Sequence, residues 1–93
     1  MAKTILITGA SSGFGEMTAY WLADASHTVY ASMRSLSDQK VEKALAYSAD
    51  REVDIRTVAL DVQDQASADA AVAHVLRERA RIDVLIHNAG HMA

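Results

Sequence analysis

The sequence contains no cysteine and no proline, and only 5% of its 93 residues are aromatic. Without cysteine, the chain cannot form a disulfide, a thiolate zinc site or a cysteine nucleophile. No apolar run approaches the roughly 18 residues that a membrane-spanning helix needs. The stretch before Gly9 is too short for a secretory signal. We therefore expect a cytoplasmic chain with no membrane segment.

The sequence also lacks an excess of positive charge, since its formal net charge is −3. Nucleic acids bind strongly basic faces, so we expect no nucleic-acid partner. The nearest basic run lies between Arg77 and Arg81. It is interpreted as the solvated last turn of a helix, where cations suit the helix dipole, in preference to a phosphate-binding track. The four histidines show no metal-ligand spacing, and no metal site is predicted.

The residues that are present are typical of a globular protein, with 51% apolar and 23% charged side chains. This length allows one domain or less, so residues 1–93 are treated as one unit. Short β-rich runs alternate along the chain with longer helical segments. The expected strands cover residues 3–8, 28–33, 54–60 and 83–87, and the expected helices are 13–25, a segment capped by Ser37 and a segment capped by Asp64.

A helical connection between each pair of strands implies right-handed crossovers and a parallel sheet. We predict an α/β fold with a Rossmann-like sheet in the order 3-2-1-4, the first two helices on one face and the third on the other. In the first helix, Met17 and Trp21 are expected in the core, and Glu16 is expected to point away from any bound phosphate. The expected core stripes of the other helices are Val41, Ala44, Leu45 and Ser48, and then Ala68, Ala71, Val72, Val75 and Leu76.

The glycines gather at one place, between the first strand and the first helix. The segment Thr8-Gly9-Ala10-Ser11-Ser12-Gly13-Phe14-Gly15 holds three of the four glycines in the chain. Free N–H groups and a partial positive charge let a helix N-terminus hold phosphate, and glycine lets the backbone approach the ligand. In this strand-turn-helix context the pattern indicates a dinucleotide site. The alternative is a glycine-rich turn that binds nothing.

Thr-Gly-x-x-x-Gly-x-Gly in this position resembles the cofactor motif of the short-chain dehydrogenases/reductases. Two further segments agree with it: Asp61-Val62 after the third expected strand, and Asn88-Ala89-Gly90 after the fourth, with His87 in place of the first Asn of that family's motif. The resemblance covers the whole chain. It implies an oxidoreductase that transfers hydride to or from a carbonyl or alcohol substrate, with Asp61 reaching the adenine of the cofactor.

The residues that carry catalysis in that family have no counterpart here. The family uses a Tyr with a Lys four residues later, whereas the residues at that spacing from Tyr20, Tyr30 and Tyr47 are Asp, Arg and Arg. No catalytic residue is therefore predicted in this chain, and Asn88 gives structural support at most. The resemblance implies the truncated, cofactor-binding half of a larger doubly wound domain, inactive alone. The alternative is a non-catalytic dinucleotide-binding or assembly fragment.

The end of the second expected strand predicts which cofactor is preferred. An Asp or Glu there would bind the ribose hydroxyl of NAD and repel a phosphate. This sequence has Met33 followed by Arg34, and a guanidinium suits phosphate, so NADP(H) is favoured over NAD(H). The alternatives are an exposed surface role for Arg34 and a helix- or turn-capping role for Asp61.

The predicted cofactor site therefore combines the glycine turn with the residues that follow the other three strands. Its members are Gly9, Ser11, Ser12, Gly13, Phe14, Gly15, Arg34, Asp61, Val62, Asn88, Ala89 and Gly90. His87 is expected to be a packed histidine with a hydrogen-bond partner. The family fold implies a further strand beside Val84–Ile86, so this edge would be open here, and we expect a homo-oligomer.

Overall fold

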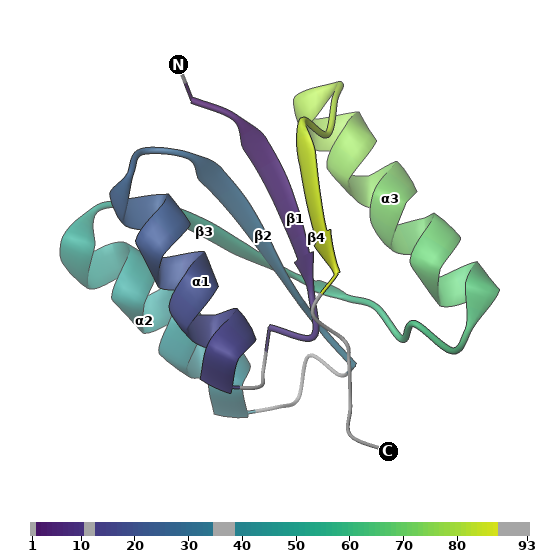
Figure 1. Cartoon of the computed structure of the whole chain (residues 1–93), viewed down its shortest axis with the longest axis horizontal. Coiled ribbons are helices and arrows are strands. Elements are labelled where there is room, and N and C mark those ends of the chain that lie inside the picture. The colour runs from purple at the N-terminus through teal and green to yellow at the C-terminus, as the bar shows by residue number, and fades with distance from the viewer. Residues whose placement is uncertain (1, 11–12, 35–38, 88–93) are drawn as a thin grey trace.

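The computed structural model describes residues 2–10, 13–34 and 39–87, which form a four-stranded parallel sheet with three helices (Figure 1). The elements are β1 (Thr4–Thr8), α1 (Gly13–Asp24), β2 (Thr28–Met33), α2 (Gln39–Arg51), β3 (Asp54–Ala59), α3 (Gln65–Arg79) and β4 (Val84–His87). The strand order is β3-β2-β1-β4, and each neighbouring pair is parallel, as the sequence predicts. The predicted cap Ser37 lies outside the described residues.

The sheet separates two apolar layers. β1 and β2 are buried along their whole length, as is usual for parallel strands covered on both faces. Helices α1 and α2 lie on one face and α3 lies on the other, which confirms the prediction (Figure 1). The first layer contains Ile5, Ile7, Ala10, Ala19, Ala23, Val29, Ala31, Met33, Ala44 and Ile55. The second contains Leu6, Tyr30, Val58, Leu60, Ala71 and Val75.

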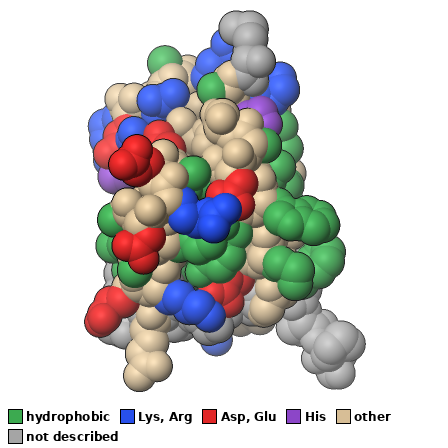
Figure 2. Space-filling view, turned by 90° about the vertical axis from the view of Figure 1, so that its left-hand side faces the viewer, with side chains coloured by type: hydrophobic (Ala, Val, Ile, Leu, Met, Phe, Trp, Pro, Cys, Tyr) green, Lys and Arg blue, Asp and Glu red, His purple; other side chains and the backbone are tan. Residues whose placement is uncertain are grey.

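The prediction that Met17 and Trp21 belong to the core is wrong. Met17 is 54% exposed and Trp21 is 72% exposed, whereas Gly15, Ala19 and Ala23 are buried against the sheet. Both sets have helical spacing, and the set with small side chains allows the closer approach of helix to strand. Figure 2 shows large apolar side chains protruding at one side of the face seen there.

The stripes predicted for the other two helices are only partly buried. Ala44 of α2 is in the core, and so are Ala71 and Val75 of α3. Other members of the same stripes are exposed: Leu45, Val72 and Leu76. Val75 and Val72 are the same size, so in α3 the position on the helix, and not the size of the side chain, decides which residue meets the sheet.

Helix α3 has the ends that the sequence predicts. The Asp64 carboxylate accepts hydrogen bonds from the N–H groups of Ala66 and Ser67, a cap worth about 1 kcal/mol. At the other end Ala80 adopts a left-handed conformation with φ 68°, and its N–H donates to the Leu76 carbonyl. Arg77 is exposed in the last turn, as expected of a solvated helix end. None of the helices in the described parts of the chain is long and apolar enough to cross a membrane.

Helices α1 and α2 are joined along their length by polar and aromatic contacts. The rings of Tyr20 and Tyr47 are stacked, with centroids 4.0 Å apart and planes 10° from parallel. Near the end of α1, Asp24 accepts a hydrogen bond from the Tyr47 hydroxyl at 2.8 Å and pairs with the Arg51 guanidinium at 3.2 Å. These contacts fix α2 relative to α1.

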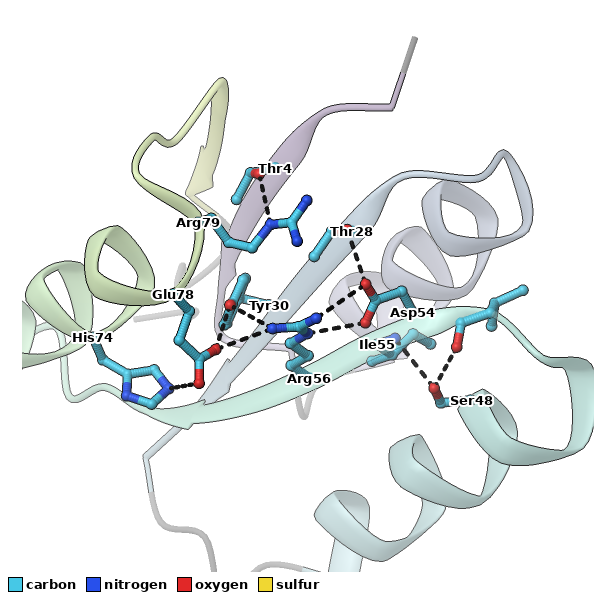
Figure 3. A network of polar contacts seen from close by, with 11 residues as sticks. Thr4, Thr28, Tyr30, Ser48, Asp54, Ile55, Arg56, His74, Glu78 and Arg79 are labelled. Carbon is cyan, nitrogen blue, oxygen red and sulfur yellow. Dashed lines mark hydrogen bonds and ion pairs between the residues drawn. The ribbon is translucent and has the colours of Figure 1, made fainter.

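On the face of the sheet that α3 covers, a network of polar side chains joins this helix to β2 and β3 (Figure 3). The Tyr30 hydroxyl donates to Glu78 of α3 and accepts from the Arg56 guanidinium of β3. Arg56 also pairs with Glu78 at 3.2 Å and with Asp54 at 3.0 Å, and Asp54 accepts from the Thr28 hydroxyl. The ring of Tyr30 is fully buried, so the network anchors the polar end of a core side chain.

This network makes the stability of the fold sensitive to acid. The hydrogen bond from Tyr30 lowers the pKa of Glu78, and outside this network the hydrogen bond from the Thr4 backbone N–H lowers the pKa of Asp83. A carboxyl with a lowered pKa stabilises the fold above its unfolded-state pKa, and this contribution is lost as the pH falls. We therefore expect the urea midpoint to drop as the pH is lowered through about 4.5 and below.

Glu78→Gln should weaken this pH dependence, because the amide cannot be protonated in this range. Asp50→Asn, at an exposed position of α2, serves as the control and should leave the pH profile unchanged. Urea denaturation followed by circular dichroism between pH 3 and pH 7 measures both variants. A profile for Glu78→Gln that matches the unmodified chain would show that this carboxylate is not a source of the acid sensitivity.

Candidate functional site

The candidate site lies where the carboxyl ends of the parallel strands meet, the edge at which open α/β sheets bind ligands. The turn after β1 begins at Gly9, whose φ of 68° is in the left-handed region that favours glycine. The N–H of Ala10 then donates to the carbonyl of Ser32 in β2 at 2.9 Å. The Ser32 hydroxyl donates to the carbonyl of Ile7 at 2.7 Å. The turn is thereby tied to both central strands before α1 begins.

The first residues of α1 differ in exposure. Gly13 is exposed, and a Cβ added there would meet no atom of the described residues within 4 Å. Phe14 is 73% exposed, whereas Gly15 is buried against the sheet. An anion at this end of the helix would meet the N–H groups and the dipole that favour it. Ser11 and Ser12, also predicted for the site, lie outside the described residues.

The residues after β2 and β3 lie close together. The Arg34 Nε lies 3.9 Å from the Asp61 Oδ2, and the Arg34 side chain is 75% exposed. The N–H of Leu60 donates to the Met33 carbonyl at 2.8 Å, which holds the two strand ends together. Val62 beside them is 44% exposed. A guanidinium at the open end of β2 is placed to meet an anionic group from solvent.

Asp61 also has the turn-capping role that the sequence left open. Its Oδ1 accepts from the N–H of Gln63 at 3.0 Å, and its own N–H donates to the Ser67 hydroxyl at 2.9 Å. The carboxylate is therefore fixed by the turn that leads into α3, with its second oxygen directed toward Arg34. Capping and ligand binding are compatible roles for this side chain.

At the fourth strand, the prediction for His87 is confirmed in part. Its Nδ1 lies 3.3 Å from the hydroxyl of Thr8, a hydrogen-bond partner in the neighbouring strand. The residue is nevertheless exposed, so it is not packed in the core. Asn88, Ala89 and Gly90 lie outside the described residues. In the described parts of the chain, no group of three or more His, Asp or Glu side chains could hold a metal ion.

Sequence reasoning missed one charged residue near the site, Lys43 of α2. Its Nζ lies 3.2 Å from the carboxylate of Glu16, in the first turn of α1. Glu16 is turned toward α2, and its side chain is only 12% exposed. No spacing in the sequence relates these two residues, because the contact depends on how α2 packs against α1.

Comparison with known proteins identifies the family. A family model described as short chain dehydrogenase matches residues 3–93. The chain belongs to the short-chain dehydrogenases. As a short-chain dehydrogenase it is 41% identical over 88 residues to a 3-ketodihydrosphingosine reductase of Bacteroides thetaiotaomicron, covering 95% of this chain and 28% of the relative.

Two further relatives of this short-chain dehydrogenase carry a cofactor in their names. It is 40% identical over 90 residues to an NADP-dependent 3-hydroxy acid dehydrogenase of Schizosaccharomyces pombe, covering 95% of this chain and 34% of the relative. It also resembles the solved structure of an actinorhodin polyketide ketoreductase with NADPH, at 28% identity and a TM-score of 0.86, over 97% of this chain and 34% of that one. The chain thus spans about a third of the length of these relatives.

Proposed function

We propose that this chain binds NADP(H) at the carboxyl ends of its strands, as the cofactor-binding part of an oxidoreductase. The observation that carries the proposal is the tied glycine turn, with Gly9 in a left-handed conformation and an exposed Gly13 at the start of α1. Backbone N–H groups of this turn can hold a pyrophosphate. The NADP-dependent and NADPH-bound relatives support the choice of ligand.

Each predicted residue has a role in this proposal. Arg34 provides the charge for the 2′-phosphate, and Met33 stands where an Asp or Glu would repel that phosphate. Asp61 and Val62 border the adenine. The remaining residues form the path of the pyrophosphate and nicotinamide, and they are Gly9, Ser11, Ser12, Gly13, Phe14, Gly15, Asn88, Ala89 and Gly90.

Cofactor preference tests the proposal. We expect the chain to bind NADPH more tightly than NADH, and Arg34→Ala to lose most of that preference, with NADPH weakened about tenfold, because a charge-assisted contact to phosphate is removed. Isothermal titration calorimetry with both cofactors measures this.

Arg77→Ala is the matched control, because Arg77 is also exposed but lies in the last turn of α3. It should leave both affinities unchanged. Equal affinities of the unmodified chain for the two cofactors, or an unchanged preference in Arg34→Ala, would contradict the role given to Arg34.

The reaction proposed for the complete catalytic unit is hydride transfer between the nicotinamide and a small carbonyl or alcohol substrate. The relatives named as reductase and dehydrogenase support this class of reaction. The second candidate is a non-catalytic dinucleotide-binding or assembly fragment. It is favoured by the lack of any Tyr-x-x-x-Lys in the sequence.

We also propose that the chain self-associates through β4. Among the described residues this strand pairs only with β1, and Leu85 in its centre is 61% exposed. Unpaired apolar edges recruit further strands. Sedimentation should show assembly of the chain at high concentration, and Leu85→Lys should reduce it, whereas Leu45→Lys on α2 should not. A monomer at every concentration, with the β4 amides strongly protected from exchange, would overturn this proposal.

A further inference from the structure

We propose that Lys43 of α2 sets the anion affinity of the α1 N-terminus by neutralising Glu16. Lys43 is thus a positioning residue for the cofactor, although it lies in a different helix from the glycine turn. The inference rests on the proposed function, because the affected ligand is the pyrophosphate of NADP(H). It goes beyond that function by assigning a role to an ion pair between two helices.

The geometry holds the Glu16 carboxylate in one place. Its Oε2 accepts a hydrogen bond from the Tyr20 hydroxyl at 2.7 Å and lies 3.2 Å from the Lys43 Nζ. Tyr20 is itself stacked on Tyr47 of α2, so Glu16, Tyr20 and Lys43 belong to one packed contact between the helices. The Glu16 side chain is largely removed from solvent, and that of Lys43 is 61% exposed.

The position of Glu16 makes this neutralisation matter. A carboxylate in the first turn of a helix interacts favourably with the dipole, but it opposes any second anion bound at the same end. Lys43 supplies the compensating charge, and Tyr20 keeps the carboxylate turned toward α2. Removing Lys43 takes away one positive charge that faces this carboxylate, so its negative charge acts more strongly at the N-terminal end of α1, where its reduced access to water limits screening.

The sign of each change distinguishes this role from a purely structural one. Lys43→Met should weaken NADPH binding, and Glu16→Gln should strengthen it, each on the order of two- to fivefold at low salt. The double variant Glu16→Gln/Lys43→Met should bind like the unmodified chain, since neither charge remains. A structural ion pair predicts instead that both single variants weaken binding. The differences in NADPH affinity between the single variants and the unmodified chain should shrink as salt is added.

The experiment is a calorimetric titration of the full chain and these variants with NADPH, repeated with inorganic pyrophosphate. Lys43→Arg keeps the charge and should bind normally. Arg51→Met removes the equivalent ion pair with Asp24 at the far end of α1 and should leave the affinity unchanged. Circular dichroism establishes that each variant is folded. The side-chain oxygen of Gln in Glu16→Gln can still accept the hydrogen bond from Tyr20. This variant therefore tests whether NADPH affinity rises, even if Lys43→Met is unfolded.

The possible failures are distinguishable. If the unmodified chain binds neither NADPH nor pyrophosphate, the proposed function and this inference are both overturned. If it binds NADPH and Arg34→Ala weakens that binding, but Glu16→Gln fails to strengthen it, only the role of Lys43 is overturned. Recovery of normal affinity in the double variant supports the inference.

Discussion

Replacing Tyr30 with alanine is expected to lower the free energy of unfolding by about 3–5 kcal/mol, the cost typical of deleting a buried aromatic ring. Tyr30 is 0% exposed and lies at the centre of β2, in the layer beneath α3 with Leu6 and Val75. The change also removes the hydroxyl that joins Glu78 to Arg56. Since small domains are stable by only about 5–15 kcal/mol, much of the native population should be lost.

Tyr30→Phe separates the ring from the hydroxyl. It keeps the packing and loses only the polar contacts, so it should cost about 1–2 kcal/mol. Tyr47→Ala, on the surface of α2 and half-buried, should cost less than Tyr30→Ala. Urea unfolding followed by circular dichroism measures all three. A midpoint for Tyr30→Ala equal to that of the unmodified chain would show that the layer beneath α3 does not depend on this ring.

The second large effect concerns catalysis: the purified chain should oxidise NADPH with carbonyl substrates no faster than the blank. A positioned proton donor contributes about 10²–10⁴-fold to such a reaction. None of the three tyrosines is followed four residues later by a lysine. Each tyrosine hydroxyl instead donates to a carboxylate, of Glu16, Glu78 or Asp24.

These contacts make the tyrosines poorer acids. Burial and the hydrogen bond to Glu16 raise the pKa of Tyr20, and burial and Glu78 raise that of Tyr30. The hydrogen bond to Asp24 raises the pKa of Tyr47. An effective general acid has a pKa near the working pH, so all three are displaced in the unfavourable direction.

The assay follows NADPH absorbance with a panel of ketones, and the Bacteroides thetaiotaomicron reductase provides the comparison. Turnover above the blank would mean that a proton donor exists in this chain. Tyr20→Phe, Tyr30→Phe and Tyr47→Phe would then identify it. Retained turnover in all three would point to a different residue type.

The sequence alone predicted the features that depend on local pattern. The strands, the parallel order and the cap at Asp64 follow from apolar runs, helical connections and a side chain that competes for backbone N–H groups. The glycine turn was also predictable, because only glycine adopts the conformation of Gly9 without strain. These properties belong to short stretches of chain.

The features that were missed depend on how the elements pack. Periodicity located an apolar stripe through Trp21 in α1, but side-chain size placed Ala19 and Ala23 against the sheet instead. The contact between Glu16 and Lys43 depends on the side-by-side packing of two helices, which no spacing within either helix encodes. The capping of a turn by Asp61 was an alternative, and it became visible only with the Gln63 contact.

The sheet order has a consequence for how the chain folds as it is synthesised. Of the four strands, β1 is made first but lies inside the sheet, and its partner on one side, β4, is made after the other three, with Leu6 opposite Leu85. The described residues buried beneath α1 and α2 come from the chain up to Ile55, and only the half-buried Val84 and Ile86 join that layer after α3, so most of it can assemble before α3 has left the ribosome. The layer beneath α3 has to wait for Ala71 and Val75. Until then the ring of Tyr30 has no helix above it, and nascent chains are most vulnerable to misassociation on this face during that interval.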